Sequence, residues 1–411
     1  MNYNINKSNN QVPKGYKKTK VGVIPEDWEV VKLGSVCEKN AKYGINAPAV
    51  EFDKNLPVYL RITDIDEKGN FNPNKISSVK DDEYKKFILQ ENELVLARTG
   101  ATVGKSYLYN KKDGELVYAG FLIKISPDLT KLNSVFLKNY LNTSLYWHWV
   151  KIMSVRSGQP GINAEEYSIL PIPLPPLKEQ KKIANILTTW DDAISQQDEL
   201  IKAKEELKKG LMQKLLSGEV RFEGFSEEWE EIRLSGIFNI TRGNVIAKKE
   251  LSTIMKDDYI YPVYSSQTKD NGILGYHNTF DFEGNFITWT TDGANAGKTT
   301  YRNGKFKCTN VCGVLYSKEN NLGTANKCIA EMIDKVSKKY VSYVGNPKLM
   351  NNVMGQVKIK LPPLQEQQKI AQVLTNADKE IDLLKNELEV LKEQKKGLMQ
   401  KLLSGEVRVK I

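Results

Sequence analysis

Cysteine and histidine, the residue types that most often build metal and catalytic sites, are scarce in this sequence. Only four cysteines and two histidines occur in 411 residues. So few cysteines exclude a disulfide framework, and the two histidines argue against histidine-based catalysis. Cys308 and Cys312, with His277 upstream, supply half of a zinc ligand set. A zinc ribbon needs a second close pair, which the sequence lacks, so we expect no metal.

Long apolar runs and an excess of acidic residues are also missing. No apolar stretch approaches the roughly 18 residues of a membrane span, and the amino terminus has no hydrophobic signal-peptide segment. We therefore expect a soluble, cytoplasmic protein without a membrane partner. Sixty Lys and Arg residues against fifty Asp and Glu give a net charge of +10. Such an excess suits a polyanionic partner.

The sequence contains a long internal repeat. Residues 174–221 and 361–408 align without a gap, 187 residues apart, and 28 of the 48 positions are identical. Both copies begin with Leu-Pro-Pro-Leu, followed by Glu-Gln, and both end with Ser-Gly-Glu-Val-Arg. A segment repeated so closely, once in the middle and once at the end, predicts a pseudo-symmetric architecture.

Each copy of the repeat predicts a long helix of the coiled-coil type. In the second copy, apolar residues recur at alternating steps of four and three, as in an a/d seam. The seam comprises Ile370, Leu374, Ala377, Ile381, Leu384, Leu388, Leu391, Leu398 and Leu402, with Lys395 in its polar gap. The first copy has a less regular seam that includes Gln197, Lys204 and Lys208. Two matched seams favour packing against each other, because each alone would expose leucines to water.

Unlike sequences separate the repeated segments. We expect residues 20–174 to form one module (module one) and residues 223–361 another (module two), with spacer helix regions at 175–222 and 362–411. Residues 1–19 are polar and lysine-rich, which predicts a flexible segment. Strand-like and helical runs in both modules predict a mixed α+β fold. The runs are Leu56–Ile62, Glu93–Ala97, Leu116–Ile125, Phe286–Thr290 and Val311–Tyr316 for strands, and Val135–Val150 and Thr324–Tyr340 for helices.

A glycine-rich motif occurs once in each module. Gly100–Ser106 and Gly293–Thr299 both read GxxxGK followed by Ser or Thr, one residue short of a P-loop. The residues after each motif favour a strand, whereas a P-loop delivers its phosphate to the amino terminus of a helix. We therefore predict a glycine-tipped turn between two strands rather than a nucleotide site.

The predicted turns carry side chains of the types that contact DNA phosphates and base edges. We expect these side chains to point outward and to bind DNA; the alternative is a solvated hairpin without a function. The candidates in module one are Arg98, Thr99, Lys105 and Tyr107 at the turn, together with Arg61 and Gln159 outside it. The candidates in module two are Thr290, Thr291, Asp292, Asn295, Lys298 and Arg302.

In the order of its segments, the chain resembles the specificity subunit of a Type I restriction-modification system. The resemblance rests on the duplicated repeat, on the entrance Gly22-Val23-Ile24-Pro25-Glu26-Asp27-Trp28 and on Ser157-Gly158-Gln159 before the first Leu-Pro-Pro-Leu. It covers nearly the whole chain. Module two departs from the pattern, because Asn351–Gln356 runs almost directly into Leu361. We therefore expect a shortened or remodelled exit loop there.

This resemblance implies an α+β protein in which two target recognition domains are separated by an antiparallel coiled coil. Each domain would read half of an asymmetric bipartite DNA site, with the spacing set by the helices. The implied partners are double-stranded DNA, two methyltransferase subunits and, optionally, two restriction subunits. S-adenosylmethionine would bind the methyltransferase, and ATP and Mg²⁺ the restriction subunit, so this chain would hold no cofactor.

The chain itself would carry no catalytic residue. It lacks a methyltransferase tetrapeptide, since Asn346-Pro347-Lys348-Leu349 has neither the second proline nor the aromatic residue of that motif. Two alternative functions differ in class. One is a coiled-coil scaffold that binds only proteins, and the other is a P-loop nucleotide-binding enzyme.

Overall fold

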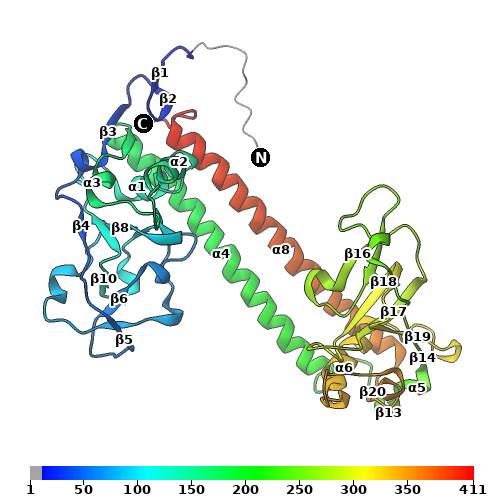
Figure 1. Cartoon of the computed structure of the whole chain (residues 1–411). Coiled ribbons are helices and arrows are strands. Elements are labelled where there is room, and N and C mark those ends of the chain that lie inside the picture. Colours follow the sequence, from blue (N-terminus) through cyan, green and yellow to red (C-terminus); the bar gives the residue numbers. More distant parts are fainter. Residues whose placement is uncertain (1–11) are drawn as a thin grey trace. The chain divides into compact units, whose positions relative to one another are not determined.

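The computed structural model describes residues 12–411, which fall into two compact units. The first unit runs to Gln197 and also contains Glu387–Ile411, and the second unit comprises Asp198–Asn386. Each unit therefore holds one module and a part of both long helices, α4 (Leu177–Leu215) and α8 (Leu364–Ser404) (Figure 1). Residues 1–11 of the predicted flexible segment lie outside the described residues, whereas Tyr16–Thr19 form strand β1.

Module one contains two four-stranded sheets, with strand orders β4-β11-β8-β9 and β10-β6-β7-β5, and two separate strand pairs. The strands are β1 (Tyr16–Thr19), β2 (Gly22–Pro25), β3 (Glu29–Lys32), β4 (Lys42–Tyr43), β5 (Ala49–Val50), β6 (Val58–Leu60), β7 (Ser78–Val79), β8 (Leu94–Ala97), β9 (Ser106–Leu108), β10 (Leu116–Tyr118), β11 (Leu122–Ile125) and β12 (Pro171–Leu174). The helices are α1 (Ser134–Tyr140), α2 (Ser144–Met153) and α3 (Ala164–Ser168).

Module two is built on one six-stranded sheet with the order β14-β19-β17-β18-β15-β16, beside the pair β13-β20. The strands are β13 (Glu230–Arg233), β14 (Phe238–Arg242), β15 (Tyr261–Tyr264), β16 (Ile273–His277), β17 (Phe282–Thr290), β18 (Thr299–Cys308), β19 (Cys312–Ser317) and β20 (Lys358–Leu361). The helices are α5 (Leu234–Ile237), α6 (Lys327–Ser337) and α7 (Asn351–Met354).

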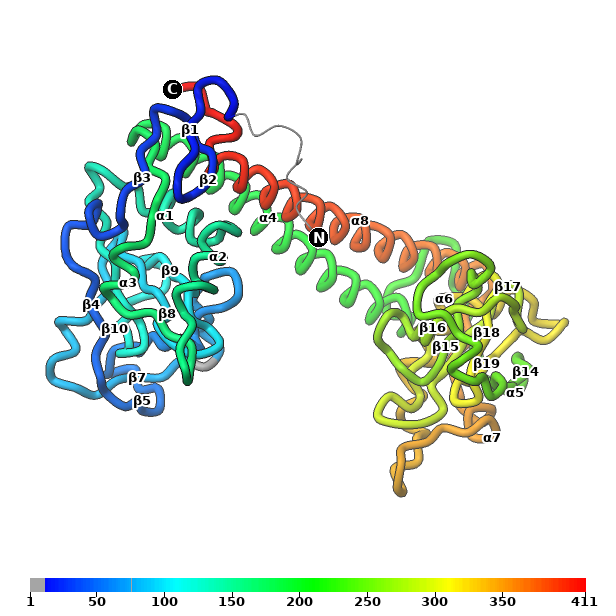
Figure 2. Tube along the Cα trace, turned by 45° about the horizontal axis from the view of Figure 1, so that its top comes forward, coloured from blue at the N-terminus to red at the C-terminus, as the bar shows by residue number. Residues whose placement is uncertain are grey.

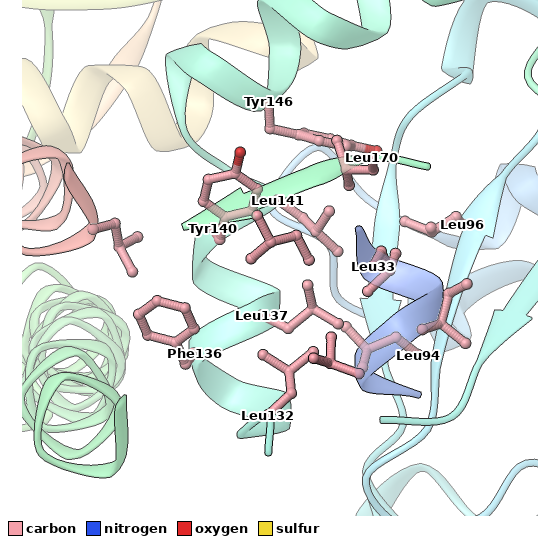
Figure 3. Packing of buried hydrophobic residues seen from close by; sticks show 14 of the residues in the cluster. Leu33, Leu94, Leu96, Leu132, Phe136, Leu137, Tyr140, Leu141, Tyr146 and Leu170 are labelled. Atoms are coloured by element: carbon pink, nitrogen blue, oxygen red, sulfur yellow. The ribbon is translucent and has the colours of Figure 1, made fainter. Parts of the chain in front are cut away.

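Apolar side chains of α1 and β8 form the centre of module one. Leu132 and Leu137 point toward Leu94 and Leu33, and all four side chains are fully buried (Figure 3). The core of module two is equivalent in design, because α6 packs its apolar face over Trp289 of β17 and the neighbouring strands. Each module thus has a core of its own.

The predicted elements agree with the structure except where a turn or a cap divides them. Each predicted strand contains or overlaps an observed one, but the run 116–125 is two strands, β10 and β11. The predicted helix 135–150 is also two helices. The first ends at Tyr140, and Thr143 caps the second, since its hydroxyl accepts a hydrogen bond from the amide of Tyr146.

The two long helices pair in antiparallel orientation. In the first unit, Lys395 of α8 lies against Asp191 of α4; in the second unit, Lys204 of α4 lies 2.6 Å from Glu380 of α8. All the predicted seam positions of α8 are buried or partly buried, so the coiled-coil prediction is confirmed. Among residues 12–411, no helix combines the length and the apolar character needed to cross a membrane.

Lysines at the polar gaps of the seams face acidic residues of the other helix. Lys208 pairs with Asp378, and Lys395 pairs with Asp191. Both lysines and both aspartates are related by the 187-residue repeat. The less regular first seam is therefore compatible with packing, because ion pairs take the place of two apolar contacts.

A buried glutamate joins three segments at the corner of each module. In module one the side chain of Glu179 is 0% exposed and accepts a hydrogen bond from the indole of Trp28 at 3.1 Å. Arg408, in the tail after α8, binds both carboxylate oxygens at 2.7 and 2.8 Å. This corner accounts for the paired Glu and Arg of the repeat and for the tryptophan of the entrance. Figure 2 shows the carboxyl end of the chain beside β1 and β2 at this place.

Module two repeats the corner with Trp229, Glu366 and Arg221. The indole donates to Glu366 at 2.9 Å, and the guanidinium binds both carboxylate oxygens at 2.9 and 2.7 Å. Burial acts to raise the pKa of Glu366, but the hydrogen bonds from Arg221 and Trp229 outweigh it and hold the pKa below its ordinary value of 4.5. The stabilisation is thus complete above that value and is lost as the pH falls through the lowered pKa.

The glutamine after each glutamate closes the start of its helix. Gln180 donates to the carbonyls of Pro175 and Lys131, both at 2.9 Å, and accepts from the amide of Asn133 at 2.8 Å. Gln367 likewise donates to the carbonyl of Pro362, and it accepts a hydrogen bond from the side-chain amide of Asn326. Because Asn133 and Asn326 cap α1 and α6, the repeated Glu-Gln pair links each long helix to the core of its module.

Replacing Arg408 with alanine should destabilise the first unit, because Glu179 would keep a buried charge without its cation. We expect a loss of roughly 2–3 kcal/mol in the free energy of unfolding, below the ~3–5 kcal/mol of a fully buried pair, since solvent screens the partly exposed guanidinium. Urea unfolding at neutral pH measures it. The matched control is Lys410→Ala, in the same tail and exposed to solvent. Equal midpoints for the two variants would contradict the role of the corner.

Candidate nucleic-acid interface

The glycine motif of module one forms a tight turn between β8 and β9. These strands are antiparallel neighbours, with Leu96 opposite Ser106. The turn, residues 98–105 (the first turn), is closed by hydrogen bonds from the amide of Gly104 to the carbonyl of Ala97 at 2.9 Å and from Lys105 to Thr102 at 3.0 Å. Gly100 and Gly104 have φ values of +77° and +91°, so the turn requires glycine at both positions.

Module two contains the same turn, residues 291–298 (the second turn), between the antiparallel strands β17 and β18. The amide of Gly297 donates to the carbonyl of Thr290 at 2.8 Å, and that of Lys298 donates to Asn295 at 3.0 Å. These are the same bonds as in the first turn, shifted by 193 residues. The prediction of a glycine-tipped turn between two strands is confirmed in both modules.

The geometry argues against nucleotide binding at these motifs. A strand follows each lysine, and the amides of Gly100, Val103, Gly104 and Lys105 are already bonded to backbone carbonyls. A P-loop needs free amides and the amino terminus of a helix to hold a phosphate. The motif therefore has a structural role here, and the P-loop alternative is set aside.

A second segment packs on each turn. In module one, residues 157–161 (the first exit loop) accept a hydrogen bond from the amide of Gly100 through the carbonyl of Pro160 at 3.0 Å. The amide of Ile162 donates to the carbonyl of Arg98 at 2.8 Å. Gln159 thus lies against the first turn, and a Cβ atom on Gly100 would come within 3.0 Å of its Nε2.

Residues 344–348 (the second exit loop) pack on the second turn in the same way. The carbonyl of Pro347 accepts from the amide of Gly293 at 2.9 Å, and the amide of Leu349 donates to the carbonyl of Thr291 at 2.8 Å. The exit loop of module two is therefore not shortened, and that expectation is wrong. Asn346, not Gln356, occupies the position equivalent to Gln159.

Sequence reasoning missed Asn346 although the sequence contains the signal. Asn346 follows Gln159 by 187 residues, the spacing that relates the two copies of the helix repeat. The same spacing joins Gly158 to Gly345 and Pro160 to Pro347. Extending the repeat alignment backwards through its dissimilar residues would have found the loop.

The structure brings four candidates of module one together and separates two others. Arg98, Thr99 and Lys105 belong to the first turn, and Gln159 lies on it. Arg61 lies beyond the end of β6, where its Nε and Nη2 bind the carboxylate of Asp64 at 2.9 and 2.8 Å. Tyr107 of β9 is 2% exposed, so its expected outward orientation is wrong.

Burial explains the position of Tyr107. Its ring belongs to an apolar cluster beside Leu60 and Tyr118, and its hydroxyl donates to Asp113 at 2.7 Å. Burial and the bond with Asp113 raise the pKa of Tyr107. Strand alternation turns this side chain into the core. The presence of a hydroxyl group, on which the prediction rested, does not show which face of the strand a residue occupies.

In module two the candidates divide in the same manner. Asp292, Asn295 and Lys298 are partly or fully exposed, and Lys298 lies 2.7 Å from Asp334 of α6. Thr290 and Thr291 are 5% and 3% exposed, so these two side chains do not point outward as expected.

Arg302 is also buried, beside a small polar cavity. Its guanidinium stacks 3.7 Å from the ring centre of Tyr264 and donates to the carbonyl of Asn271 at 2.8 Å. Burial lowers the pKa of Arg302. The cavity, of about 100 Å³, is also lined by Lys298, Thr290 and other hydroxyl and amide side chains. The expected outward position of Arg302 is wrong, and a contact with DNA would require access through this cavity.

The cysteines do not form a metal site in the part of the chain that the structure describes. Cys308 and Cys312 are buried with their Sγ atoms 3.4 Å apart. No group of three possible ligands occurs among residues 12–411.

Comparison with known proteins identifies related chains. Residues 25–205 and 226–393 match the family described as the Type I restriction modification DNA specificity domain. A putative type I specificity subunit of Mycoplasma pneumoniae is 34% identical over 212 residues, which cover 51% of this chain and 84% of that protein. The putative MjaX specificity subunit of Methanocaldococcus jannaschii is 26% identical over 96% of this chain and 97% of its own length.

The fold matches a solved structure over nearly its whole length. The crystal structure of the S subunit of a Type I restriction-modification system from M. genitalium superimposes with a TM-score of 0.60, covers 96% of this chain and 97% of its own and is 19% identical. At that identity, the likeness establishes the fold alone.

Changing Tyr107 to phenylalanine tests the corrected position of this residue. The variant removes the donor to Asp113, so we expect the free energy of unfolding to fall by about 1–2 kcal/mol while the folded protein binds DNA normally. Thermal unfolding and a DNA-binding titration measure both effects, with Tyr316→Phe at an exposed position as control. Unchanged stability with weakened DNA binding would restore Tyr107 as a contact residue.

Proposed function

The chain belongs to the family of Type I restriction-modification DNA specificity proteins, and we propose that it recognises an asymmetric bipartite DNA site. Module one reads one half of the site and module two the other half. The observation that carries the proposal is the pair of equivalent turn-and-loop units: one backbone framework presents Arg98, Thr99 and Gln159 in one module and different polar residues in the other. A shared framework with different side chains suits two related reading heads with different targets.

Positive side chains at the turns would bind the DNA backbone and set the register. Arg98 lies 4.6 Å from the ring centre of Tyr43, which holds the guanidinium beside the first turn. Lys105 and Lys298 occupy the same position of the two turns, and each has one acidic neighbour, Glu67 and Asp334. A phosphate could compete for these lysines, so binding should weaken with added salt.

The long helices would set the spacing of the two half-sites. A continuous helix of 39 residues extends about 58 Å at 1.5 Å per residue, a distance of the order of one and a half turns of DNA, which repeats about every 34–36 Å. Coiled-coil packing of α4 on α8, with the ion pairs at Lys208 and Lys395, would make this spacer stiff. Such a spacer would leave a fixed number of unread base pairs between the half-sites.

Partner subunits would perform the chemistry. The duplicated frame offers two equivalent surfaces, which suits two methyltransferase subunits that bind S-adenosylmethionine. Two restriction subunits, with ATP and Mg²⁺, could join them in a restricting system. This chain would act without a cofactor or a catalytic residue, since its role is to place the partner on the correct adenine, which the partner then rotates out of the stack.

A genome-wide map of N6-methyladenine tests this function. The chain is expressed with its methyltransferase partner in a host that has no adenine methylation. We expect one asymmetric motif of two unlike half-sites with a constant spacer, because two different modules read the DNA from one stiff frame. Omitting the chain while keeping the methyltransferase is the control, and it should give no motif.

Other outcomes would contradict parts of the proposal. A contiguous motif would mean that one module does not read DNA. A variable spacer would mean that the helices do not set the distance. Absence of methylation by an intact complex would favour the protein-binding scaffold.

A further inference from the structure

We infer that Asn346 is the specificity-determining residue of module two that corresponds to Gln159 of module one, and that each amide reads an adenine in its half-site. This inference rests on the proposed function. It assigns a DNA-reading role to a residue that was not among the DNA-binding candidates predicted from the sequence, and it names the base.

Both amides project from equivalent backbone positions in the two modules. Each exit loop is joined to its turn by two hydrogen bonds, from the first turn glycine to the loop proline and from the residue after the loop back to the turn. The four donor–acceptor distances lie between 2.8 and 3.0 Å. Gln159 and Asn346 therefore start from equivalent Cα positions in their modules.

The backbone of each loop is restrained at the residue that carries the amide side chain. Gln159 precedes Pro160 and Asn346 precedes Pro347, and a following proline restricts a residue to extended backbone. The carbonyl of that proline is held by the turn glycine. Little conformational entropy would be lost when such a side chain binds, because the backbone is already ordered.

Both side-chain amide groups are available to bind a ligand. Gln159 and Asn346 are exposed, and within residues 12–411 neither side chain donates or accepts a hydrogen bond with the protein. An exposed amide on an ordered loop, beside turns that carry Arg98, Lys105 and Lys298, lies where a DNA-bound module would contact bases. Lys348, next to Asn346, is exposed as well and adds a positive charge to this surface.

The chemistry of the amide selects the base. A carboxamide presents one donor and one acceptor side by side, which matches the N7 acceptor and N6 donor of adenine in the major groove. Guanine offers two acceptors along that edge and would leave the amide oxygen unpaired. An uncharged amide also gains less from phosphate than a lysine does, so a base contact is the better use of this position.

The test compares methylation by complexes that contain wild-type chain, Asn346→Ala or Gln159→Ala. We expect Asn346→Ala to lose its preference for adenine at one position of the second half-site, by about 5- to 150-fold in relative methylation rate, from the ~1–3 kcal/mol of a bidentate base contact. The first half-site and the spacer should stay unchanged. Gln159→Ala should show the reverse pattern.

Conservative variants and a matched control complete the test. Asn346→Gln and Gln159→Asn keep the amide, so they should retain the preference for adenine at a reduced rate. Asn320→Ala removes an exposed asparagine elsewhere in module two and should give the wild-type motif.

Two results would overturn the inference while the proposed function stands. An unchanged motif in Asn346→Ala would show that the amide reads no base. A uniform loss of methylation at all sites would make it a backbone anchor. If the wild-type complex gives no bipartite motif, the proposed function itself fails, and the inference that rests on it fails as well.

Discussion

The buried glutamate at each module corner is the interaction on which the architecture depends. Glu179 and Glu366 lie where an entrance strand, a long helix and the tail of the other long helix meet, and each accepts bonds from a tryptophan and an arginine. A charge in a dry site is costly unless it is paired. The corner therefore forms only when all three segments are in place, which couples each module to both helices.

The residues that hold each module on the long helices are different from the residues that line its candidate DNA-binding surface. The corners and the glycine turns are duplicated with the same contacts, and the seams share an equivalent Lys–Asp pair, while the side chains on the turns and exit loops differ between modules. Residues that hold the corners are buried and paired, whereas Gln159 and Asn346 are exposed and make no side-chain hydrogen bond within residues 12–411. Side chains at such positions can differ between the modules without a cost to the fold, which is what a protein with two different half-sites would require.

The sequence predicted what depends on periodicity and repetition. The long helices, their seams and the two hairpin turns follow from spacing alone, because coiled-coil and glycine-turn geometries have strict sequence requirements. Orientation was less predictable. Tyr107 and Arg302 are polar residues of the strands that follow the two turns, yet both are buried. Tyr107 lies in an apolar cluster, and Arg302 stacks on Tyr264 beside a polar cavity. Asn346 was missed because only the flanking glycine and proline of its loop are identical to those around Gln159. The equivalence is clear in three dimensions, where both loops make the same backbone hydrogen bonds to their turns.

In the proposed function, the two modules are interchangeable on the pair of long helices, and each module reads half of the DNA site. The most direct measurement is the methylation motif of a chimera in which residues 29–174 replace residues 230–361, so that Trp229 and both helices remain. We expect a symmetric motif, made of the first half-site and its inverted copy at the wild-type spacing. An asymmetric motif that retains the second half-site, from a chimera shown to fold and to bind its partner, would mean that the exchanged module does not determine that half-site.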